Sequence, residues 1–384
     1  MIRERTGKKS DAYSKLATCV ALFLLAVASA SGQQVHQLLY NGSIWMDENL
    51  NGTLVDSFFT GVAAFPTTPN EQLHVYYLQI NSDHVYQLFY NGATWSDEDL
   101  TALSGGKPAH DTSAVVGFPV GNYQYVFFVG SDSHVHQLLY NNANWTDTDL
   151  TVIGGGTFAY TANLVAFTTS PALHVYYIDF GQHIHQLFAT NGTNWQDQDL
   201  TTLTGAGLAG DGVSNMTGFN IDNFQYVYYL DVNANVHQLY YNNSKWSDED
   251  LTALTKTSPA GFGGISALAI PGTKKMRVYL VAGINDHVLQ LSSTNNAKWT
   301  SSDLTKKAKG QLPGGPVAIS AVASAGKVSV FYASNSLYRI FQPTSTTWTN
   351  ENLTIAGDGD EVTPATQIVG FSLQNDLYIY YVGN

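Results

Sequence analysis

Histidines spaced for metal or acid–base chemistry occur in pairs along the chain. His134 and His136 are two residues apart, as are His183 and His185, so a β-strand would present each pair on one face. A zinc site needs three or four ligands, and the other copies of this segment keep one of the two positions or neither. We therefore interpret these histidines as polar lining or hydrogen-bonding groups, and we predict no metal and no cofactor.

Aspartates recur in pairs within the motif W-x-D-x-D-L-T. The pairs include Asp97, Asp99, Asp147, Asp149, Asp248 and Asp250. Clustered carboxylates can bind calcium, but these follow the start of a strand and lack the D-x-D-x-D-G loop pattern. Structural roles in turns or at the surface are the favoured interpretation.

Signatures of an enzyme are missing from the sequence. It has no G-x-S-x-G elbow and no S-x-D-x-G-x-x-W box, and its one cysteine, Cys19, lies in an N-terminal segment that we expect to be removed. Glycosidases use one pair of carboxylates in one place, whereas the carboxylates here recur with the repeat. We therefore predict a non-catalytic protein with several similar binding sites, whose weak affinities would add through multivalency.

These residues belong to a sevenfold repeat marked by tryptophans. They are Trp45, Trp95, Trp145, Trp195, Trp246, Trp299 and Trp348, at successive spacings of 50, 50, 50, 51, 53 and 49 residues. A leucine follows each tryptophan five residues later. One unit, residues 161–201, contains the short β-prone segments TANLVAFTT, HVYYID, HIHQLFAT and NWQDQDLT. Four antiparallel strands per unit of this length predict the blade of a β-propeller, and a solenoid is the alternative.

The two ends of the repeat are complementary halves. Six complete units occupy residues 61–101, 113–151, 161–201, 215–252, 264–305 and 317–354. The N-terminal part holds only the last two strands of a unit, and the C-terminal part only the first two. The sequence thus predicts an all-β, seven-bladed propeller, four antiparallel strands per blade, whose N- and C-terminal strands share one blade and remove exposed edges.

The N-terminal residues 1–30 are typical of a signal peptide. A basic segment precedes an apolar run over residues 16–28, and Ala28-Ser29-Ala30 offers a cleavage site. The run is short for a membrane span. We expect a secreted or periplasmic protein with one domain, residues 31–384. Cleavage would remove five basic and two acidic residues, which moves the net charge from −13 to −16. Such an acidic chain is a poor partner for nucleic acid or an anionic membrane.

Three segments of the repeat resemble a known family. HVYYLQINSDHVYQLFY, HVYYIDFGQHIHQLF and RVYLVAGINDHVLQL are similar to the blade core of the Aleuria-type fucose-specific lectins of fungi and their bacterial relatives. The resemblance implies a propeller with sugar sites between neighbouring blades, usually with six blades. In that family an Arg on one strand and a Glu on the next hold the sugar hydroxyls, and an aromatic ring of a neighbouring blade stacks on the sugar.

The resemblance implies a set of candidate ligand-binding residues in this chain. The Arg position holds His74, Tyr125, His174, Tyr226, Arg277, Ser329 and Tyr378. The Glu position holds Gln87, Gln137, Gln186, Gln238, Gln290, Arg339 and Gln37. An Arg–carboxylate pair forms stronger, charge-assisted hydrogen bonds, but His or Tyr with Gln still supplies donors and acceptors. These residues are compatible with a site for neutral glycans. We do not extend the family's specificity for fucose to this chain. The alternative is that these pairs only satisfy cross-strand polar contacts.

The repeated tryptophans have two possible roles. They can pack neighbouring blades together, or Trp95, Trp145, Trp195 and Trp246 can stack on the apolar face of a sugar at the blade junctions. Our leading hypothesis is a lectin-like protein whose partners are glycans or glycoconjugates. The alternative is an exported scaffold that binds protein through one propeller face, with residues 306–316 and 355–365 as its variable surface.

Overall fold

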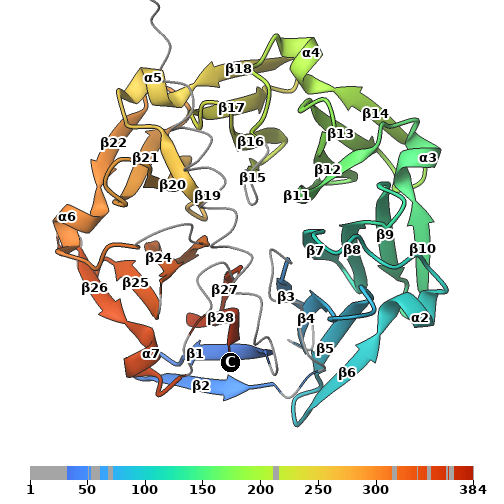
Figure 1. Ribbon diagram of the computed structural model, residues 1–384, viewed down its shortest axis with the longest axis horizontal. Coiled ribbons are helices and arrows are strands. Elements are labelled where there is room, and N and C mark those ends of the chain that lie inside the picture. The colour runs from blue at the N-terminus through green and yellow to red at the C-terminus, as the bar shows by residue number, and fades with distance from the viewer. Residues whose placement is uncertain are drawn as a thin grey trace, which may run out of the picture.

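The structure is a computed structural model that describes residues 33–50, 52, 61–67, 72–210, 216–313, 318–334, 336–343, 347–359, 362 and 367–383. The predicted signal peptide lies outside the described residues. Within them, strands form seven four-stranded antiparallel sheets arranged as a ring (Figure 1). The prediction of a seven-bladed all-β propeller is confirmed.

We number the blades in the order in which their fourth strands occur along the chain. Blade 1 contains β1 (Gln34–Tyr40), β2 (Trp45–Asn49), β27 (Val369–Leu373) and β28 (Asp376–Gly383). Blade 2 contains β3 (Ala63–Thr67), β4 (Gln72–Leu78), β5 (Val85–Tyr90) and β6 (Trp95–Asp99). Blade 3 contains β7 (Val115–Val120), β8 (Tyr123–Val129), β9 (Val135–Tyr140) and β10 (Trp145–Asp149). Blade 4 contains β11 (Ala159–Thr169), β12 (Ala172–Asp179), β13 (Ile184–Ala189) and β14 (Trp195–Asp199).

The remaining blades follow the same order. Blade 5 contains β15 (Met216–Ile221), β16 (Phe224–Leu230), β17 (Val236–Tyr241) and β18 (Trp246–Asp250). Blade 6 contains β19 (Ala260–Ala269), β20 (Lys275–Ala282), β21 (Val288–Thr294) and β22 (Thr300–Asp303). Blade 7 contains β23 (Ile319–Ser324), β24 (Lys327–Ala333), β25 (Leu337–Phe341) and β26 (Thr349–Asn352). The first strand of each blade lies nearest the ring axis and the fourth lies at the rim (Figure 1).

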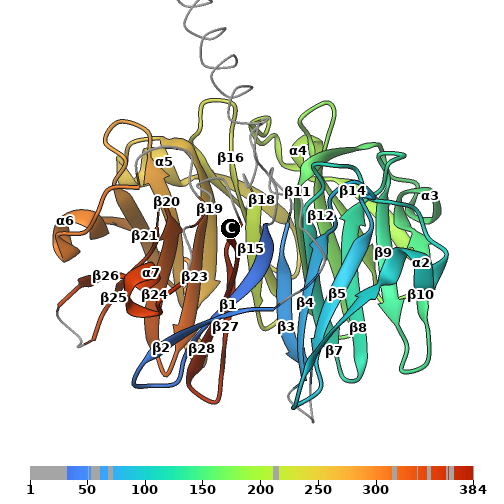
Figure 2. The ribbon, with the colours of Figure 1, turned by 60° about the horizontal axis from the view of Figure 1, so that its bottom comes forward.

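A one-turn helix follows the outer strand of blades 2 to 7. These helices are α2 (Leu100–Ser104), α3 (Leu150–Gly154), α4 (Leu200–Thr204), α5 (Leu251–Thr255), α6 (Leu304–Ala308) and α7 (Leu353–Ala356). They lie on the outer rim of the ring (Figure 2). No helix among the described residues is long and apolar enough to cross a membrane.

The motif W-x-D-x-D-L-T builds this strand-to-helix corner. Its second acidic position caps the helix, as in Asp99, whose carboxylate accepts from the Ala102 amide at 2.9 Å. The leucine, Leu100, is buried, and the hydroxyl of Thr101 accepts from the Val85 amide of the neighbouring strand at 3.0 Å. The motif therefore recurs because every outer strand needs the same cap and anchor.

The core of the ring lies between blades. Each junction buries a cluster of apolar side chains. Among the described residues, five tryptophans also meet an aromatic ring of the preceding blade edge to face: Trp45, Trp145, Trp195, Trp246 and Trp299. Trp145 packs on Tyr76 with ring centroids 6.4 Å apart, and Trp246 packs on Tyr176 at 6.2 Å. The tryptophans thus serve as packing groups between blades, one of the two roles expected for them.

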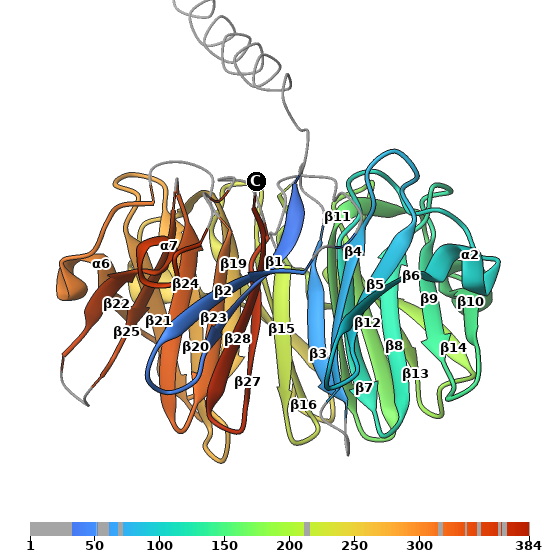
Figure 3. The same cartoon turned by 90° about the horizontal axis from the view of Figure 1, so that it is seen from below.

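Blade 1 closes the ring by joining the two ends of the chain. Strand β1 pairs with β28 over seven residue pairs, from Gln34 opposite Gly383 to Tyr40 opposite Leu377. Figure 3 shows β1 and β2, in blue, beside β28 and β27, in red. The sequence prediction of a shared blade is confirmed.

Candidate functional site

The candidate His and Gln residues of blades 2 and 4 lie on neighbouring strands, and their side chains are on the same face of the blade. In blade 4, Tyr176 stands opposite Gln186, and His174 stands two residues along β12 from Tyr176. Because side chains alternate across a strand, His174, Tyr176 and Gln186 share a face. Blade 2 has the same arrangement with His74, Tyr76 and Gln87. This face is turned toward the next blade, because Tyr76 and Tyr176 contact that blade's tryptophan.

The His–Gln pairs of blades 2 and 4 are hydrogen-bonded and buried. The Gln186 amide nitrogen lies 2.8 Å from His174 Nδ1, and the equivalent Gln87–His74 distance is 2.7 Å. Since an amide nitrogen only donates, the imidazole Nδ1 must accept, so the ring proton lies on Nε2. That proton points to Thr169 Oγ1, which is 2.7 Å from His174 Nε2.

Burial keeps both histidines neutral. It lowers the pKa of His74 and of His174 to about 4, because a charged imidazole loses its hydration inside the junction. A protonated ring would also lose the Nδ1 acceptor that the glutamine uses. The pairs are therefore fixed polar groups at neutral pH.

Glutamines of the following blade complete these sites, and the sequence reasoning missed them. Gln225 of blade 5 accepts from the Gln186 amide nitrogen at 2.9 Å and also from the Tyr176 hydroxyl. Gln124 of blade 3 accepts from the Tyr76 hydroxyl at 2.5 Å. A signal was present, because L-H-V-Y-Y occurs in β4 and β12 only, and Q-Y-V only in β8 and β16.

One acceptor of this constellation has no partner. The side chain of Gln87 is 3% exposed, and its Oε1 atom is buried without a hydrogen-bond partner among the described residues. A buried acceptor left unpaired costs roughly 1–3 kcal/mol. Such an atom at the edge of a pocket is suited to receive a hydroxyl from a ligand.

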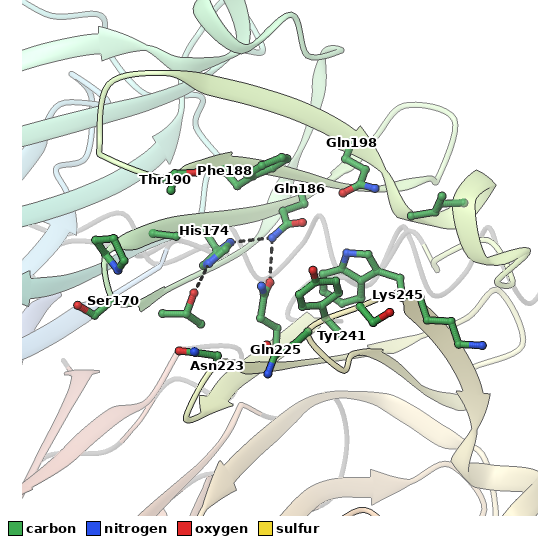
Figure 4. Close-up of a pocket in the computed structure, with 17 residues that line it drawn as sticks. Ser170, His174, Gln186, Phe188, Thr190, Gln198, Asn223, Gln225, Tyr241 and Lys245 are labelled. Atoms are coloured by element: carbon green, nitrogen blue, oxygen red, sulfur yellow. Dashed lines mark hydrogen bonds between the residues drawn. The ribbon is translucent and has the colours of Figure 1, made fainter.

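The junction of blades 4 and 5 contains the larger of the two matching cavities, which we call pocket 4/5. Its volume is about 780 Å³, within the range usual for small-molecule sites. Figure 4 shows His174, Gln186 and Gln225 joined by hydrogen bonds, with Tyr241 beside them. The lining also includes Thr169, Phe188, Gln198, Leu203, Lys245 and Trp246.

The junction of blades 2 and 3 contains its counterpart, pocket 2/3, with a volume of about 360 Å³. Its lining is His74, Gln87, Phe89, Glu98, Leu103, Gln124, Tyr140, Asn144 and Trp145, with Gln72 and Ala143. Both pockets carry an exposed leucine from the adjacent one-turn helix, Leu103 at 60% and Leu203 at 55% exposure. Each thus combines buried amides, aromatic rings and one apolar side chain at the rim.

The other predicted positions lie in junctions that differ from these two. In blade 3, Tyr125 and Gln137 face blade 4, which offers Leu173 instead of a glutamine at the matching position; Trp195 packs there on Phe127. In blade 5, the Gln238 amide donates to Asn296 at 3.1 Å, and Tyr226 stacks on Tyr240.

Blades 1 and 6 provide two further variants. Arg277 lines a small cavity of about 250 Å³ with residues of its own blade, and Gln290 accepts from the Tyr279 hydroxyl at 3.3 Å. The junction of blades 1 and 2 holds a cavity of about 590 Å³, lined by Gln37, Tyr378 and Trp95 among others. The structure therefore does not make the seven junctions equivalent.

Blade 7 carries a charged pair at its junction with blade 1. Arg339 contacts Glu351 at 3.6 Å and donates to Ser329 at 2.9 Å. Its guanidinium lies over the rings of Tyr40, Trp45 and Phe341 at 3.9–5.5 Å. Burial lowers the pKa of Arg339 to about 10, although the charge of Glu351 favours the protonated form. The pair thus links the last complete blade to the closing blade.

The recurring histidines bind the recurring aspartates. His134 Nδ1 lies 2.7 Å from Asp149, and His136 Nδ1 lies 3.1 Å from Asp147. Among the described residues, one group of three side chains, Asp132, His134 and Asp149, is close enough for a metal ion. The His134–Asp149 hydrogen bond already uses two of these side chains to hold the helix cap. The polar-lining interpretation of these histidines therefore accounts for their contacts.

Residues 306–316 and 355–365, the proposed protein-binding surface, are described in part. Positions 314–317, 360–361 and 363–366 lie outside the described residues. The scaffold alternative therefore stays a prediction.

Comparisons with known proteins place these features in context. Residues 8–208 match the model of the fungal fucose-specific lectin family. A lectin of Burkholderia pseudomallei, BP39L, matches with a TM-score of 0.59 and 14% identity, over 85% of this chain and 98% of that one. A triple-arginine mutant of AofleA from Arthrobotrys oligospora matches with a TM-score of 0.54 and 12% identity, over 94% and 96%.

A further similar structure is the lectin of Aleuria aurantia, described as a six-bladed propeller with a novel mode of fucose recognition. Its TM-score is 0.50 and its identity 17%, over 77% of this chain and 95% of that one. Identities this low establish a shared fold alone. A search of curated protein sequences finds no match.

Proposed function

This chain belongs to the fungal fucose-specific lectin family, and from that premise we propose that it is a secreted, non-catalytic lectin with its main sugar sites in pockets 2/3 and 4/5. The observation that carries the proposal is the repeated constellation of His, Gln and Tyr from one blade with Gln and Trp from the next. The same groups recur 99 to 101 residues apart, from Gln87 to Gln186, from His74 to His174 and from Gln124 to Gln225.

Each pocket offers what a neutral sugar needs. The buried Oε1 of Gln87 accepts a sugar hydroxyl and relieves an unpaired polar atom. Aromatic side chains supply flat apolar surface for the C–H face of the ring, and the exposed Leu103 and Leu203 suit a methyl group. The Aleuria aurantia lectin recognises fucose and has been solved in complex with α-methyl-L-fucoside, so fucosides are the first sugars to test.

The chemistry of the linings favours binding over hydrolysis. Glycosidases of the two-carboxylate type need a pair of carboxyl groups about 5–10 Å apart. Among the described lining residues, pocket 2/3 has one carboxylate, Glu98, and pocket 4/5 has none. Two sites of modest affinity on one rigid ring would gain strength by binding multivalent glycans. The basic and apolar residues 1–30 support export.

A glycan array followed by calorimetric titration tests the proposal. We expect Gln87→Ala and Gln186→Ala each to remove one class of site, and the double variant to bind at least tenfold more weakly, because buried hydrogen bonds are lost in both pockets. Gln137→Ala is the matched control, since Gln137 is equally buried at the equivalent strand position but lies outside both pockets. A double variant that binds as tightly as the unmodified protein would refute the assignment.

A further inference from the structure

The two pockets share their buried groups but differ in charge at two matched positions. At the outer strand, pocket 2/3 has Glu98 where pocket 4/5 has Gln198. In the turn before the tryptophan, pocket 2/3 has Asn144 where pocket 4/5 has Lys245. Both differences make pocket 2/3 more negative than pocket 4/5, because the first places an anion in pocket 2/3 and the second places a cation in pocket 4/5.

These differences set the net charge of each lining. His74 and His174 are neutral at neutral pH, because burial lowers their pKa values to about 4. The remaining described lining residues of pocket 4/5 contain one charged side chain, Lys245, and those of pocket 2/3 contain one, Glu98. The two cavities therefore present opposite charges to a ligand, on a protein whose formal net charge is −13.

Lys245 is held in place by its backbone, while its ammonium is available. Its amide donates to Asn242 Oδ1 at 3.0 Å, and its carbonyl accepts from the Asn242 amide at 3.3 Å, which fixes the turn. The side chain is exposed and forms no ion pair with the described residues. Figure 4 shows it at the rim, beyond Tyr241 and away from the His174–Gln186 pair. It can thus meet the part of a glycan that projects from the pocket.

We propose that pocket 4/5 selects glycans that carry an anionic group, a carboxylate or a sulfate, through Lys245, whereas pocket 2/3 disfavours them through Glu98. The inference rests on the proposed lectin function and adds a ligand class to it. The buried amides would hold the sugar ring in either pocket, and the rim charge would choose between neutral and anionic forms. The protein would then carry two sites of different specificity on one ring.

Rim charges in water have modest effects. An exposed ion pair changes affinity about two- to fivefold. Attraction in one pocket and repulsion in the other should therefore separate the preferences of the two pockets by about four- to twenty-five-fold. Such a preference falls at high ionic strength, because the screening length shortens from about 10 Å at 0.1 M salt to about 3 Å at 1 M.

The test isolates each pocket and compares matched sugars. Gln87→Ala leaves pocket 4/5, and Gln186→Ala leaves pocket 2/3. The probes are fucose against 3-O-sulfofucose, and galactose against galacturonate, so that sulfate and carboxylate are read separately. In the Gln87→Ala protein we expect at least one anionic sugar to bind two- to fivefold more tightly than its neutral partner at low salt, and Lys245→Asn to remove that preference.

Reciprocal exchange gives the control. In the Gln186→Ala protein, Glu98→Gln combined with Asn144→Lys should create the preference that Lys245→Asn abolishes in pocket 4/5. The inference would be overturned if neutral sugars still bind but Lys245→Asn leaves the ratio of the affinities for anionic and neutral sugars unchanged. If no sugar, neutral or anionic, binds either protein or the unmodified chain, the proposed function itself fails, and this inference with it.

Discussion

At the scale of single residues, neutral side chains in blades 2 and 4 occupy the positions where the family resemblance implies an ion pair. His174 and Gln186 form a hydrogen bond that requires an uncharged imidazole, and burial supplies that state by lowering the pKa of His174 to about 4. His136, His185 and His237 behave in the opposite way. Burial opposes their charge, but hydrogen bonds and nearby aspartates outweigh it and raise their pKa values above 6.5.

These opposite shifts act in different pH ranges. The depressed pKa of His174 contributes stability that is present above pH 6.5 and is lost as the pH falls toward 4. The raised pKa values of the other three contribute stability that is present below pH 6.5 and is lost as the pH rises through them. On acidification from pH 7 to 5 the two classes act in opposite directions, so a substitution at His174 is needed to read its contribution separately.

We predict that His174→Asn reduces the loss of stability on acidification. Asn can still accept at the Nδ1 position, but it does not titrate. Between pH 7 and 5 the unmodified protein should lose about 2 kcal/mol more free energy of unfolding than the variant. Denaturant unfolding at the two pH values measures the difference. Equal losses in both proteins would show that the His174 pKa is not depressed.

At the scale of elements, the one-turn helices α2 to α6 each end in a residue with left-handed backbone conformation, which is a glycine in three of them and a lysine in two. Gly105, Gly155 and Gly205 end α2, α3 and α4 with positive φ angles of 64–71°. Lys256 and Lys309 hold the same left-handed conformation after α5 and α6, at 54° and 51°. A side chain in this conformation is strained, which glycine avoids.

We therefore expect Lys256→Gly to stabilise the protein by about 0.5–1 kcal/mol, because the relief of strain exceeds the added entropy of the unfolded chain. Gly205→Ala is the reverse control and should destabilise by about 1 kcal/mol. A Cβ at Gly205 would meet no atom within 4 Å, so the effect would be purely conformational. Thermal unfolding of both variants measures the pair. A Lys256→Gly protein that melts at a lower temperature would contradict the argument.

At the scale of the whole molecule, closure by blade 1 holds the ring together. Seven residue pairs join β1 to β28, and the Tyr380 hydroxyl donates to Gln37 at 2.9 Å across that seam. Without β1, strand β28 would present an unpaired edge, which promotes association with other chains. The seam also positions Arg339 of blade 7 against Tyr40 and Trp45 of blade 1.

A chain that begins at residue 51 should fail to close the ring. It lacks β1 and β2, so the hydrogen bonds between β1 and β28 and the burial of the side chains around them are lost. We therefore expect aggregation or a melting temperature lower by at least about 10 °C. Size-exclusion chromatography and thermal unfolding measure both effects. A chain that begins at residue 31, which keeps β1 and β2, is the control. If the shorter chain stays monodisperse with an unchanged melting temperature, closure does not stabilise the ring.

The sequence by itself determined the seven blades, their four strands and the shared closing blade. The alternation of side chains along each strand and the regular spacing of the tryptophans from Trp45 to Trp348 can be read directly from the chain. The two incomplete units at the ends together contain the four strands of one blade, which can be recognised without knowledge of tertiary contacts. The family resemblance also placed His174 and Gln186 on adjacent strands, and the structure pairs those strands with Gln186 opposite Tyr176.

The tertiary structure alone decided which junctions hold matching pockets. A site between blades depends on residues of two repeat units. Gln124 of blade 3 and Gln225 of blade 5 accept hydrogen bonds from the preceding blade. Blade 4 has Leu173 at the matching position, and a leucine side chain cannot accept a hydrogen bond. Aligned units show that L-H-V-Y-Y and Q-Y-V each occur in two blades, but the alignment does not show that these segments meet across a junction. Only the packing of one blade on the next shows which partners meet, because these contacts join residues about 40 to 50 positions apart in the chain.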